Sequence, residues 1–455
     1  MALESINPST GEVISIYTPH NTEEVNAKIE QGHQAFLRWK ESSFSERSAL
    51  MFNMASVLRK RKAELANLMA LEMGKPLKAG EAEIEKCAFC CEYYSQNAES
   101  LLKDEFIDTE AERSYVTFKP IGVVLAIMPW NFPFWQVFRF VAPALMAGNT
   151  GVLKHSSNVC GCALAIDRIV VEAGFPDNVF QTLLIGSEAV DAVIENPLIK
   201  AVTLTGSTAA GMKVAAKAGS LLKKTVLELG GSDPYLILED ADLEEAARVC
   251  TESRLINSGQ SCIAAKRFIV VKAVADEFIK LFRKQMEAKT MGDPMSPDTQ
   301  IGPQARADLR DELHQQVKKS IAMGAECILG GNIPHNSFAF YPASILVNVT
   351  KGMPAYDEEL FGPVAAVIIA ENEEDAINKA NDSVFGLGSA VFSRDKKRAE
   401  DIAANKLEAG CSFVNDFVKS DPRLPFGGIN QSGYGRELSS YGIKEFVNIK
   451  TVYIK

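Results

Sequence analysis

The sequence predicts an α/β protein with two lobes, each built on a parallel sheet, and a small β-ribbon. Apolar strand-like runs alternate with amphipathic helical stretches from residue 121 to residue 240, and a second series begins at residue 242. Strands that alternate with helices of this length form βαβ units, which bury both faces of a parallel sheet. At 455 residues the chain is also longer than a single hydrophobic core usually supports.

The first hundred residues favour helices, and strands follow them. Helical spacing of apolar residues runs through three stretches, namely 22–40, 46–72 and 79–103. Thr22 stands at the start of the first stretch and is its expected cap. Residues 112–130 then indicate two strands separated by Lys119 and Pro120, of which the first is polar enough for an exposed ribbon.

Each α/β series has its own expected elements. The first series contains helices at about 158–173 and 208–218. The second contains helices at 242–257, 274–287, 303–323 and 373–381 and strands at 267–271 and 364–369. Because the chain has no internal repeat and no Pro/Ser-rich linker, we expect two tightly joined lobes with a ligand cleft between them.

Charge and cysteine usage exclude several classes of function. The formal net charge of −10 argues against a nucleic-acid partner or an anionic membrane surface, since both need a basic face. The first residues show no secretory leader, and polar residues interrupt the apolar stretch at 121–146, so no membrane segment is expected. The nine cysteines follow no disulfide spacing, which favours a reduced, cytoplasmic protein.

Three short segments carry residues that suit covalent catalysis: MPWNFP with Asn131, LELGGSDP with Glu228 and SGQSC with Cys262. Each residue also has an ordinary alternative, since Cys262 would be a buried thiol, Glu228 a satisfied structural acid and Asn131 a helix cap. Together they form one mechanism. A thiolate attacks a carbonyl, an amide stabilises the oxyanion, and a carboxylate activates water to release the acyl group.

The motifs PWNFP, TLTGST, LELGGSDP, GQSC and EELFGPV, in that order, resemble the NAD(P)-dependent aldehyde dehydrogenase superfamily, and the resemblance extends from INPSTGE to PFGGINQSGYGRE. It implies that Cys262 is the nucleophile, Glu228 the general base, and Asn131 with the backbone N–H of Cys262 the oxyanion hole. The substrate would form a thiohemiacetal on Cys262, pass a hydride to the nicotinamide and leave a thioester. The resemblance also implies two Rossmann-like lobes, a cofactor-binding lobe of residues 1–105 and 121–228 and a catalytic lobe of residues 229–432.

The cofactor is expected at the start of a helix. TLTGSTAAG follows an apolar strand, so the backbone N–H groups of Gly206 and Ser207 would meet a phosphate. The resemblance implies further cofactor contacts from Pro129, Trp130, Leu229, Glu359 and Phe361.

The segment KHSSN indicates which dinucleotide is bound. The family usually has a lysine at the position of Lys154 and, in NAD-preferring members, a glutamate at the position of Ser157. A hydroxyl in place of that acid removes the repulsion of a 2′-phosphate, and Lys154 adds positive charge. NADP is therefore the expected cofactor, and NAD is expected to be used less well.

The helix after Asn131 indicates the substrate. Trp135 and Arg139 follow Asn131 at helical spacing and fall near one face. An arginine on an apolar face needs an anionic partner, either a carboxylate at the far end of the substrate or an acid of the protein. Ser261 and Ser420 are further candidate donors to that carboxylate. Within the family the chain most resembles the short succinate-semialdehyde dehydrogenases of bacteria, which implies oxidation of succinate semialdehyde to succinate.

Three other functions stay open. The same site would suit another short aldehyde or semialdehyde. An acylating dehydrogenase, which passes the thioester to coenzyme A or phosphate, is disfavoured by the hydrolytic base Glu228. A non-catalytic structural member of the family is disfavoured by the intact Cys262, Glu228 and Asn131.

Two remaining features concern metals and partners. Cys87, Cys90 and Cys91 have no second pair of ligands at a matching spacing, so no metal site is expected. The strand-like segments 106–120 and 441–455 have few expected neighbours within the chain. In the family such segments pair between subunits, which implies a homodimer or a homotetramer.

Overall fold

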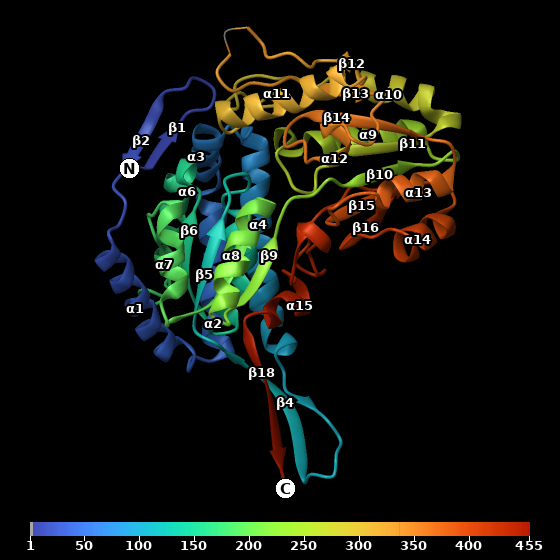
Figure 1. Cartoon of the computed structure of the whole chain (residues 1–455). Helices are drawn as coiled ribbons and strands as arrows, with labels where there is room; N and C mark the ends of the chain where they lie inside the picture. Colours follow the sequence, from blue (N-terminus) through green and yellow to red (C-terminus); the bar gives the residue numbers. More distant parts are fainter. Residues whose placement is uncertain (1–2, 336) are drawn as a thin grey trace.

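The computed structural model describes residues 3–335 and 337–455, which form two large sheets, a three-stranded ribbon and an N-terminal hairpin (Figure 1). The large sheets have six and seven strands and are mainly parallel. Helices cover both of them (Figure 1). The predicted α/β architecture with two parallel-sheet lobes and a small ribbon is confirmed.

The N-terminal residues form the hairpin and four helices. Their bounds are β1 (Leu3–Ile6), β2 (Val13–Tyr17), α1 (Thr22–Trp39), α2 (Phe44–Lys60), α3 (Lys62–Met73) and α4 (Leu77–Leu101). Thr22 is not the cap of α1. Asn21 caps it, because its side chain accepts a hydrogen bond from the Glu24 backbone N–H at 2.9 Å. The single stretch expected at 46–72 is two helices that meet at Arg61.

The six-stranded sheet has the order β17-β9-β8-β5-β6-β7. Its strands are β5 (Val123–Met128), β6 (Thr150–His155), β7 (Phe180–Thr182), β8 (Ile199–Thr205), β9 (Lys224–Glu228) and β17 (Gly433–Tyr434). The helices between them are α5 (Trp135–Met146), η1 (Ser157–Val159), α6 (Cys160–Glu172), η2 (Ser187–Ala189), α7 (Val190–Glu195) and α8 (Thr208–Ser220). Strand β17 returns from the C-terminal part of the chain and pairs antiparallel with β9, with Gly433 opposite Glu228.

The seven-stranded sheet has the order β12-β13-β14-β11-β10-β15-β16. Its strands are β10 (Pro234–Ile237), β11 (Arg267–Val271), β12 (Glu326–Leu329), β13 (Ser344–Val347), β14 (Val364–Ala370), β15 (Gly388–Phe392) and β16 (Cys411–Val414). The helices that connect these strands are α9 (Leu243–Leu255), η3 (Ile256–Gly259), η4 (Lys272–Val274), α10 (Ala275–Glu287), α11 (Ala307–Ala322), α12 (Pro354–Asp357), α13 (Glu373–Asn381) and α14 (Lys396–Asn405). Two further helices follow the last strand, η5 (Asn430–Ser432) and α15 (Ser439–Lys444), and α15 packs against α4 and α5.

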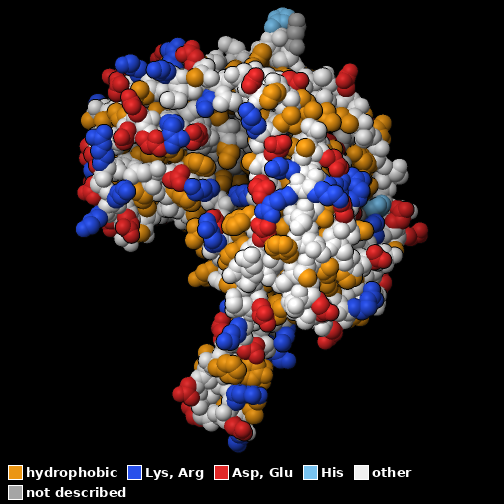
Figure 2. Space-filling model, turned by 180° about the vertical axis from the view of Figure 1, so that it is seen from behind, with side chains coloured by type: hydrophobic (Ala, Val, Ile, Leu, Met, Phe, Trp, Pro, Cys, Tyr) orange, Lys and Arg blue, Asp and Glu red, His pale blue; other side chains and the backbone are white. Residues whose placement is uncertain are grey.

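The ribbon contains β3 (Glu105–Phe106), β4 (Arg113–Pro120) and β18 (Val447–Ile454) and projects away from both lobes (Figure 1). The expectation of few neighbours within the chain is wrong for β4 and β18. These strands pair with each other along their whole length, from Val447 opposite Pro120 to Ile454 opposite Arg113. Hydrophobic side chains nevertheless remain on the surface of the ribbon (Figure 2).

Helix α5 fixes the position of the turn that carries Asn131. Every residue of α5 is buried, because α2 and α4 pack against it and it also contacts β5 and β6. The helix begins shortly after Asn131, so its packing fixes the turn that carries this residue. Within the described part of the chain, no helix combines the length and the hydropathy needed to cross a membrane.

Candidate active site

A cleft lined by residues of both lobes contains most of the predicted site residues. Its volume is about 940 Å³ with its open mouth included. The predicted residues that line it are Pro129, Trp130, Asn131, Gly206, Ser207, Leu229, Cys262, Glu359 and Phe361. Residues that were not predicted complete the lining, among them Gln136 and Gln316.

Cys262 lies between η3 and β11, after a tight loop. Asn257, Ser258 and Gly259 all have positive φ angles, of 51°, 56° and 78°. A side chain at position 259 would lie 2.2 Å from the backbone of Gly362, so only glycine fits there. The strained backbone of this loop is held by the surrounding structure and places Cys262 at the wall of the cleft.

Lys266 holds the loop that carries Cys262, and the sequence analysis did not identify it. Its Nζ donates to the backbone carbonyls of Cys262 at 2.6 Å and Ser261 at 2.9 Å, and forms an ion pair with Glu359 at 3.1 Å. Burial raises the pKa of the Cys262 thiol to about 12, although the charges of Arg139 and Lys266 oppose this. The thiol is therefore protonated at neutral pH until a proton acceptor reaches it.

Asn131 has the geometry of an oxyanion donor. Its Nδ2 donates to the backbone carbonyl of Gln260 at 3.1 Å. An amide nitrogen carries two N–H groups, so Nδ2 has a second N–H beyond this bond, and Asn131 lines the same cleft as Cys262. The backbone carbonyl of Asn131 accepts from Asn257 Nδ2 at 2.7 Å and from Lys75 Nζ at 2.9 Å, which orients the residue.

The buried pair Lys75–Glu83 supports this turn. Glu83 accepts hydrogen bonds from the backbone N–H groups of Phe134 and Trp135, both at 2.9 Å, at the start of α5. Lys75 forms an ion pair with Glu83, and its Nζ lies 3.9 Å from the centre of the Phe132 ring. The sequence analysis missed this pair. The sequence held one signal for it, because helical periodicity places Glu83 on the buried face of α4.

Glu228 ends β9 but is absent from the lining of the cleft. Neither carboxyl oxygen has a hydrogen-bond partner among the described residues. A Cβ atom on Gly427 would lie 2.7 Å from Glu228 Oε1, so the side chain faces the segment around Gly427. Burial, and after it the neighbouring Glu437, raise the pKa of Glu228 well above its usual value.

Arg139 has an acid partner within the protein. Its guanidinium pairs with Glu437, donates to Thr205 Oγ1 at 3.2 Å and lies 4.9 Å from the centre of the Phe426 ring. Only 2% of the residue is exposed. Of the two partners considered for this arginine, the structure contains the protein acid. Contact of Arg139 with the carboxylate of a substrate stays a prediction.

Trp135 and Ser420 lie together, as expected, but they share a cation that was not predicted. Trp135 Nε1 donates to Ser420 Oγ at 3.1 Å, and Lys86 Nζ donates to the same oxygen at 2.8 Å. Lys86 Nζ also lies 4.2 Å from the centre of the Trp135 ring. Ser261, the remaining candidate, is 1% exposed and lies outside the lining of the cleft.

The cofactor end of the cleft begins at α8. The N–H of Gly206 donates to the carbonyl of Glu228 at 3.0 Å, so the prediction that it meets a phosphate is wrong. Ser207 is the N-cap of α8, and its Oγ accepts from the Ala210 N–H at 3.3 Å. The first N–H groups of a helix have no acceptor inside it, so the start of α8 can hold an anion in the cleft.

The candidates for the adenosine end lie outside this cleft. Lys154 is the penultimate residue of β6 and has a partly buried side chain, and burial lowers its pKa. Ser157 is exposed in η1 and lines a second cavity together with Arg306. Between them, His155 is buried with its pKa lowered to about 4 by desolvation, and its Nε2 lies 2.9 Å from the carbonyl of Pro133. His155 therefore supports the PWNFP turn.

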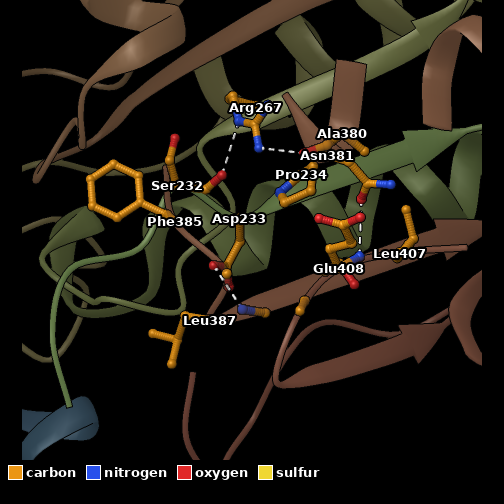
Figure 3. Close-up of a pocket in the computed structure, with 14 residues that line it drawn as sticks. Ser232, Asp233, Pro234, Arg267, Ala380, Asn381, Phe385, Leu387, Leu407 and Glu408 are labelled. Atoms are coloured by element: carbon orange, nitrogen blue, oxygen red, sulfur yellow. Dashed lines mark hydrogen bonds between the residues drawn. The ribbon is translucent and has the colours of Figure 1, made fainter. Parts of the chain in front are cut away.

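The segment after Glu228 is anchored in the second sheet (Figure 3). Asp233 accepts from the Gly388 N–H at 3.0 Å, and Arg267 donates to the carbonyls of Ser232 and Ala380, both at 2.9 Å. Burial raises the pKa of Asp233 to about 6. These bonds fix the chain where it passes from the first sheet to the second.

The match to known proteins agrees with this geometry. The model of the aldehyde dehydrogenase family matches residues 1–452. The chain belongs to the aldehyde dehydrogenase family. This aldehyde dehydrogenase is 48% identical to a probable succinate-semialdehyde dehydrogenase (NADP(+)) of Synechocystis sp. and 46% identical to succinate-semialdehyde dehydrogenase (NADP(+)) 1 of Mycobacterium tuberculosis, with 100% of each chain covered. The crystal structure of succinic semialdehyde dehydrogenase from Streptococcus pyogenes in complex with NADP+ superimposes with a TM-score of 0.97 at 37% identity, again over 100% of both chains.

Proposed function

We propose that this aldehyde dehydrogenase oxidises succinate semialdehyde to succinate with NADP as the hydride acceptor. One observation carries the proposal. Cys262 and Asn131 line the same cleft as the start of α8, so a thiol, an oxyanion donor and an anion-binding helix end meet in one space. The full-length similarity to NADP-dependent succinate-semialdehyde dehydrogenases supports the choice of substrate and cofactor.

The proposed reaction uses Cys262 as an acyl carrier. After its proton is removed, the sulfur bonds to the aldehyde carbon, and the Asn131 amide with the Cys262 backbone N–H holds the oxyanion of the thiohemiacetal. Bound NADP supplies the acceptor for the hydride that leaves this carbon. Glu228 then takes a proton from the water that attacks the thioester. The Glu228 carboxyl faces Gly427, so this last step requires the side chain to turn toward Cys262.

The test is a spectrophotometric assay of the purified protein. NADPH absorbance should appear when succinate semialdehyde and NADP are added without coenzyme A or phosphate. Cys262→Ala should abolish it, because no other residue replaces the covalent acyl carrier. A strict requirement for coenzyme A would indicate an acylating enzyme, and inactivity of the wild type with every aldehyde would indicate a structural member. Oxidation of only other short aldehydes would disprove the proposed substrate.

The preference for NADP over NAD is proposed from Lys154 and Ser157. The residues fit a 2′-phosphate, because Ser157 is an exposed hydroxyl and Lys154 stands near it on β6 and carries positive charge. Ser157→Glu should lower kcat/KM for NADP about tenfold or more and leave NAD nearly unchanged, since like charges repel at this position. Steady-state kinetics with both cofactors measures this. Equal losses for NADP and NAD would contradict the assignment.

We also propose a homodimer or homotetramer and a cytoplasmic location. The ribbon exposes Phe106, Ile449 and Tyr453, each by more than half of its surface, and such side chains are usually covered by a partner. All nine cysteines are free thiols, which suits a reducing compartment. Light scattering that reported a monomer in solution would contradict the assembly.

A further inference from the structure

Lys266, the residue directly before β11, is a fully buried lysine with an acceptor for each of its N–H groups. Its Nζ donates to the carbonyl of Cys262 at 2.6 Å and to the carbonyl of Ser261 at 2.9 Å, and it pairs with the carboxylate of Glu359 at 3.1 Å. An ammonium nitrogen carries three N–H groups, one for each of these oxygen atoms. The ammonium group of Lys266 is therefore held from three directions.

The backbone of Lys266 is anchored in the middle of the seven-stranded sheet. Its N–H donates to the carbonyl of Asp233 at 3.2 Å, and its carbonyl accepts from the N–H of Ala366 at 3.0 Å. The next residue, Arg267, begins β11, which lies between β10 and β14. The sheet thus fixes one end of the lysine side chain, and the three acceptors fix the other end.

One of these contacts acts on the group that is proposed to hold the oxyanion. The carbonyl of Ser261 and the N–H of Cys262 belong to the same peptide group. Within the described residues this N–H donates to no other group, whereas the Ser261 carbonyl accepts from both Lys266 and the N–H of Ala264, the latter at 3.2 Å. A cation bonded to the oxygen of a peptide group polarises it and makes its N–H a stronger donor. Lys266 therefore orients and strengthens the free N–H of Cys262.

The contact with Glu359 connects the same lysine to the cofactor end of the cleft. Glu359 lines the cleft, and its Oε1 also accepts from the N–H of Gly231 at 3.1 Å. Its Oε2 lies against Gly230, where a Cβ atom would be 2.6 Å away. Hydride transfer requires the carbon bound to Cys262 and the nicotinamide in a fixed relative position. The residues that support these two reactants meet at one ammonium group.

Stability alone does not explain a buried lysine at this position. Taking a cation out of water costs free energy, and a buried ion pair is often no more stable than an apolar replacement. The charge does reach the sulfur of Cys262. Burial raises the pKa of this thiol, and the charges of Arg139 and then Lys266 oppose the rise, whereas Glu359 and Glu228 add to it.

We propose that Lys266 is a positioning residue of the reaction, which directs the N–H of Cys262 toward the oxyanion and couples it to Glu359 at the cofactor. This inference rests on the proposed covalent mechanism at Cys262. Lys266 is fully buried and absent from the lining of the cleft, so it acts through these two residues and not by contact with the substrate.

Steady-state kinetics of Lys266→Met in the full-length protein with saturating NADP is the first test. The value of kcat should fall about tenfold to a hundredfold, because the oxyanion donor loses its support but is not removed. KM for succinate semialdehyde should change by less than about threefold, since the lost interaction belongs to the transition state. Butanal should show the same loss of kcat, because both aldehydes form the same oxyanion. An unchanged kcat would overturn the proposal.

Alkylation of Cys262 by iodoacetamide, in protein without cofactor, separates this role from general support of the loop. Loss of the positive charge raises the pKa of the thiol further, so the rate at about pH 8 should fall about threefold to tenfold in Lys266→Met. A loosened loop would instead expose the thiol and raise the rate. Mass spectrometry of the peptide that contains Cys262 measures the rate. A rate equal to or above that of the wild type would overturn the proposal.

The matched control is Lys272→Met, which removes a lysine just after β11 that pairs with Glu371 at 3.1 Å. It should change neither kcat nor the alkylation rate. If Lys266→Met does not fold, Lys266→Gln keeps a donor without the charge and should show the same two losses in smaller measure. Unchanged kcat and alkylation in Lys266→Gln would then overturn the proposal.

A double variant tests the coupling to Glu359. The loss of kcat in Lys266→Met combined with Glu359→Gln should be smaller than the product of the two single losses, because both substitutions remove the same contact. Losses that simply multiply would disprove the coupling. A wild-type protein that oxidises butanal but not succinate semialdehyde would instead disprove the proposed substrate, and the effect of Lys266→Met on butanal would still decide this inference.

Discussion

Lys75 and Lys86 both lie near the start of α5, over the rings of Phe132 and Trp135, and have different surroundings. Lys75 is fully saturated, with Glu83, the Asn131 carbonyl and the face of Phe132 around its ammonium group. Lys86 has a serine oxygen and an aromatic ring but no acid. Both residues are lysines, so residue type does not distinguish them. A lysine whose ammonium group is paired with a carboxylate supports the structure of the site, whereas one without a carboxylate partner is available to a ligand.

The largest expected effect is a loss of stability, and it should differ between variants of the two lysines. Lys75→Met should lower the free energy of unfolding by about 3–5 kcal/mol, because it leaves the buried Glu83 without its counter-charge. It should also lower kcat, since Asn131 loses a bond that orients it. Lys86→Met should cost less than about 1 kcal/mol, because no ion pair is lost. Denaturant unfolding of each variant gives the comparison.

A double variant is the matched control for this stability difference. Lys75→Met combined with Glu83→Leu removes both charges and should recover part of the loss, because an apolar replacement of a buried pair is often tolerated. Similar losses for the single variants of Lys75 and Lys86 would show that the proposed distinction between them is wrong.

A smaller effect, on pH dependence, sharpens the comparison. The pKa of Lys86 is lowered to about 8, first by burial and then by the charge of Arg139, whereas Glu83, Cys87 and Cys90 oppose this. Lys86 is therefore charged below about pH 8 and neutral above it. A charged Lys86 would attract the carboxylate of succinate semialdehyde, so the ratio of kcat/KM for this substrate to that for butanal should fall as pH rises through about 8. Both substrates react at Cys262, so the ionisation of its thiol changes both values of kcat/KM equally and does not change their ratio.

The corresponding ratio in Lys86→Met should not change with pH. A ratio that stayed constant in the wild type across this range, measured by initial rates in buffers of equal ionic strength, would mean that Lys86 does not bind the carboxylate.

Much of the fold follows from local patterns. Strand β11 and helix α13 occupy the predicted residues 267–271 and 373–381, because their apolar spacing is regular and their ends carry clear signals. Short elements such as β12, β13 and β16 were not predicted. A strand of four residues has too few positions to show a period, and it becomes a strand through the ladder beside it.

The site shows the same division. Motifs in the sequence located Cys262 and Asn131, and both line the cleft. They left two partners open for Arg139, and the structure pairs it with Glu437 from a distant part of the chain. They also gave a wrong role to the N–H of Gly206, because this group donates to the carbonyl of Glu228 on the neighbouring strand. Lys86 was missed, since a single lysine on a helix carries no signal of what surrounds it.

By itself the sequence determined the alternation of strands and helices, the family and the chemistry of a thiol beside an amide, because these depend on residue type and on spacing along the chain. Only the tertiary structure decided which buried charges are paired. The free energy of a charge in the interior depends on atoms within a few ångströms. For Arg139 and Glu437 those atoms belong to segments far apart in the sequence.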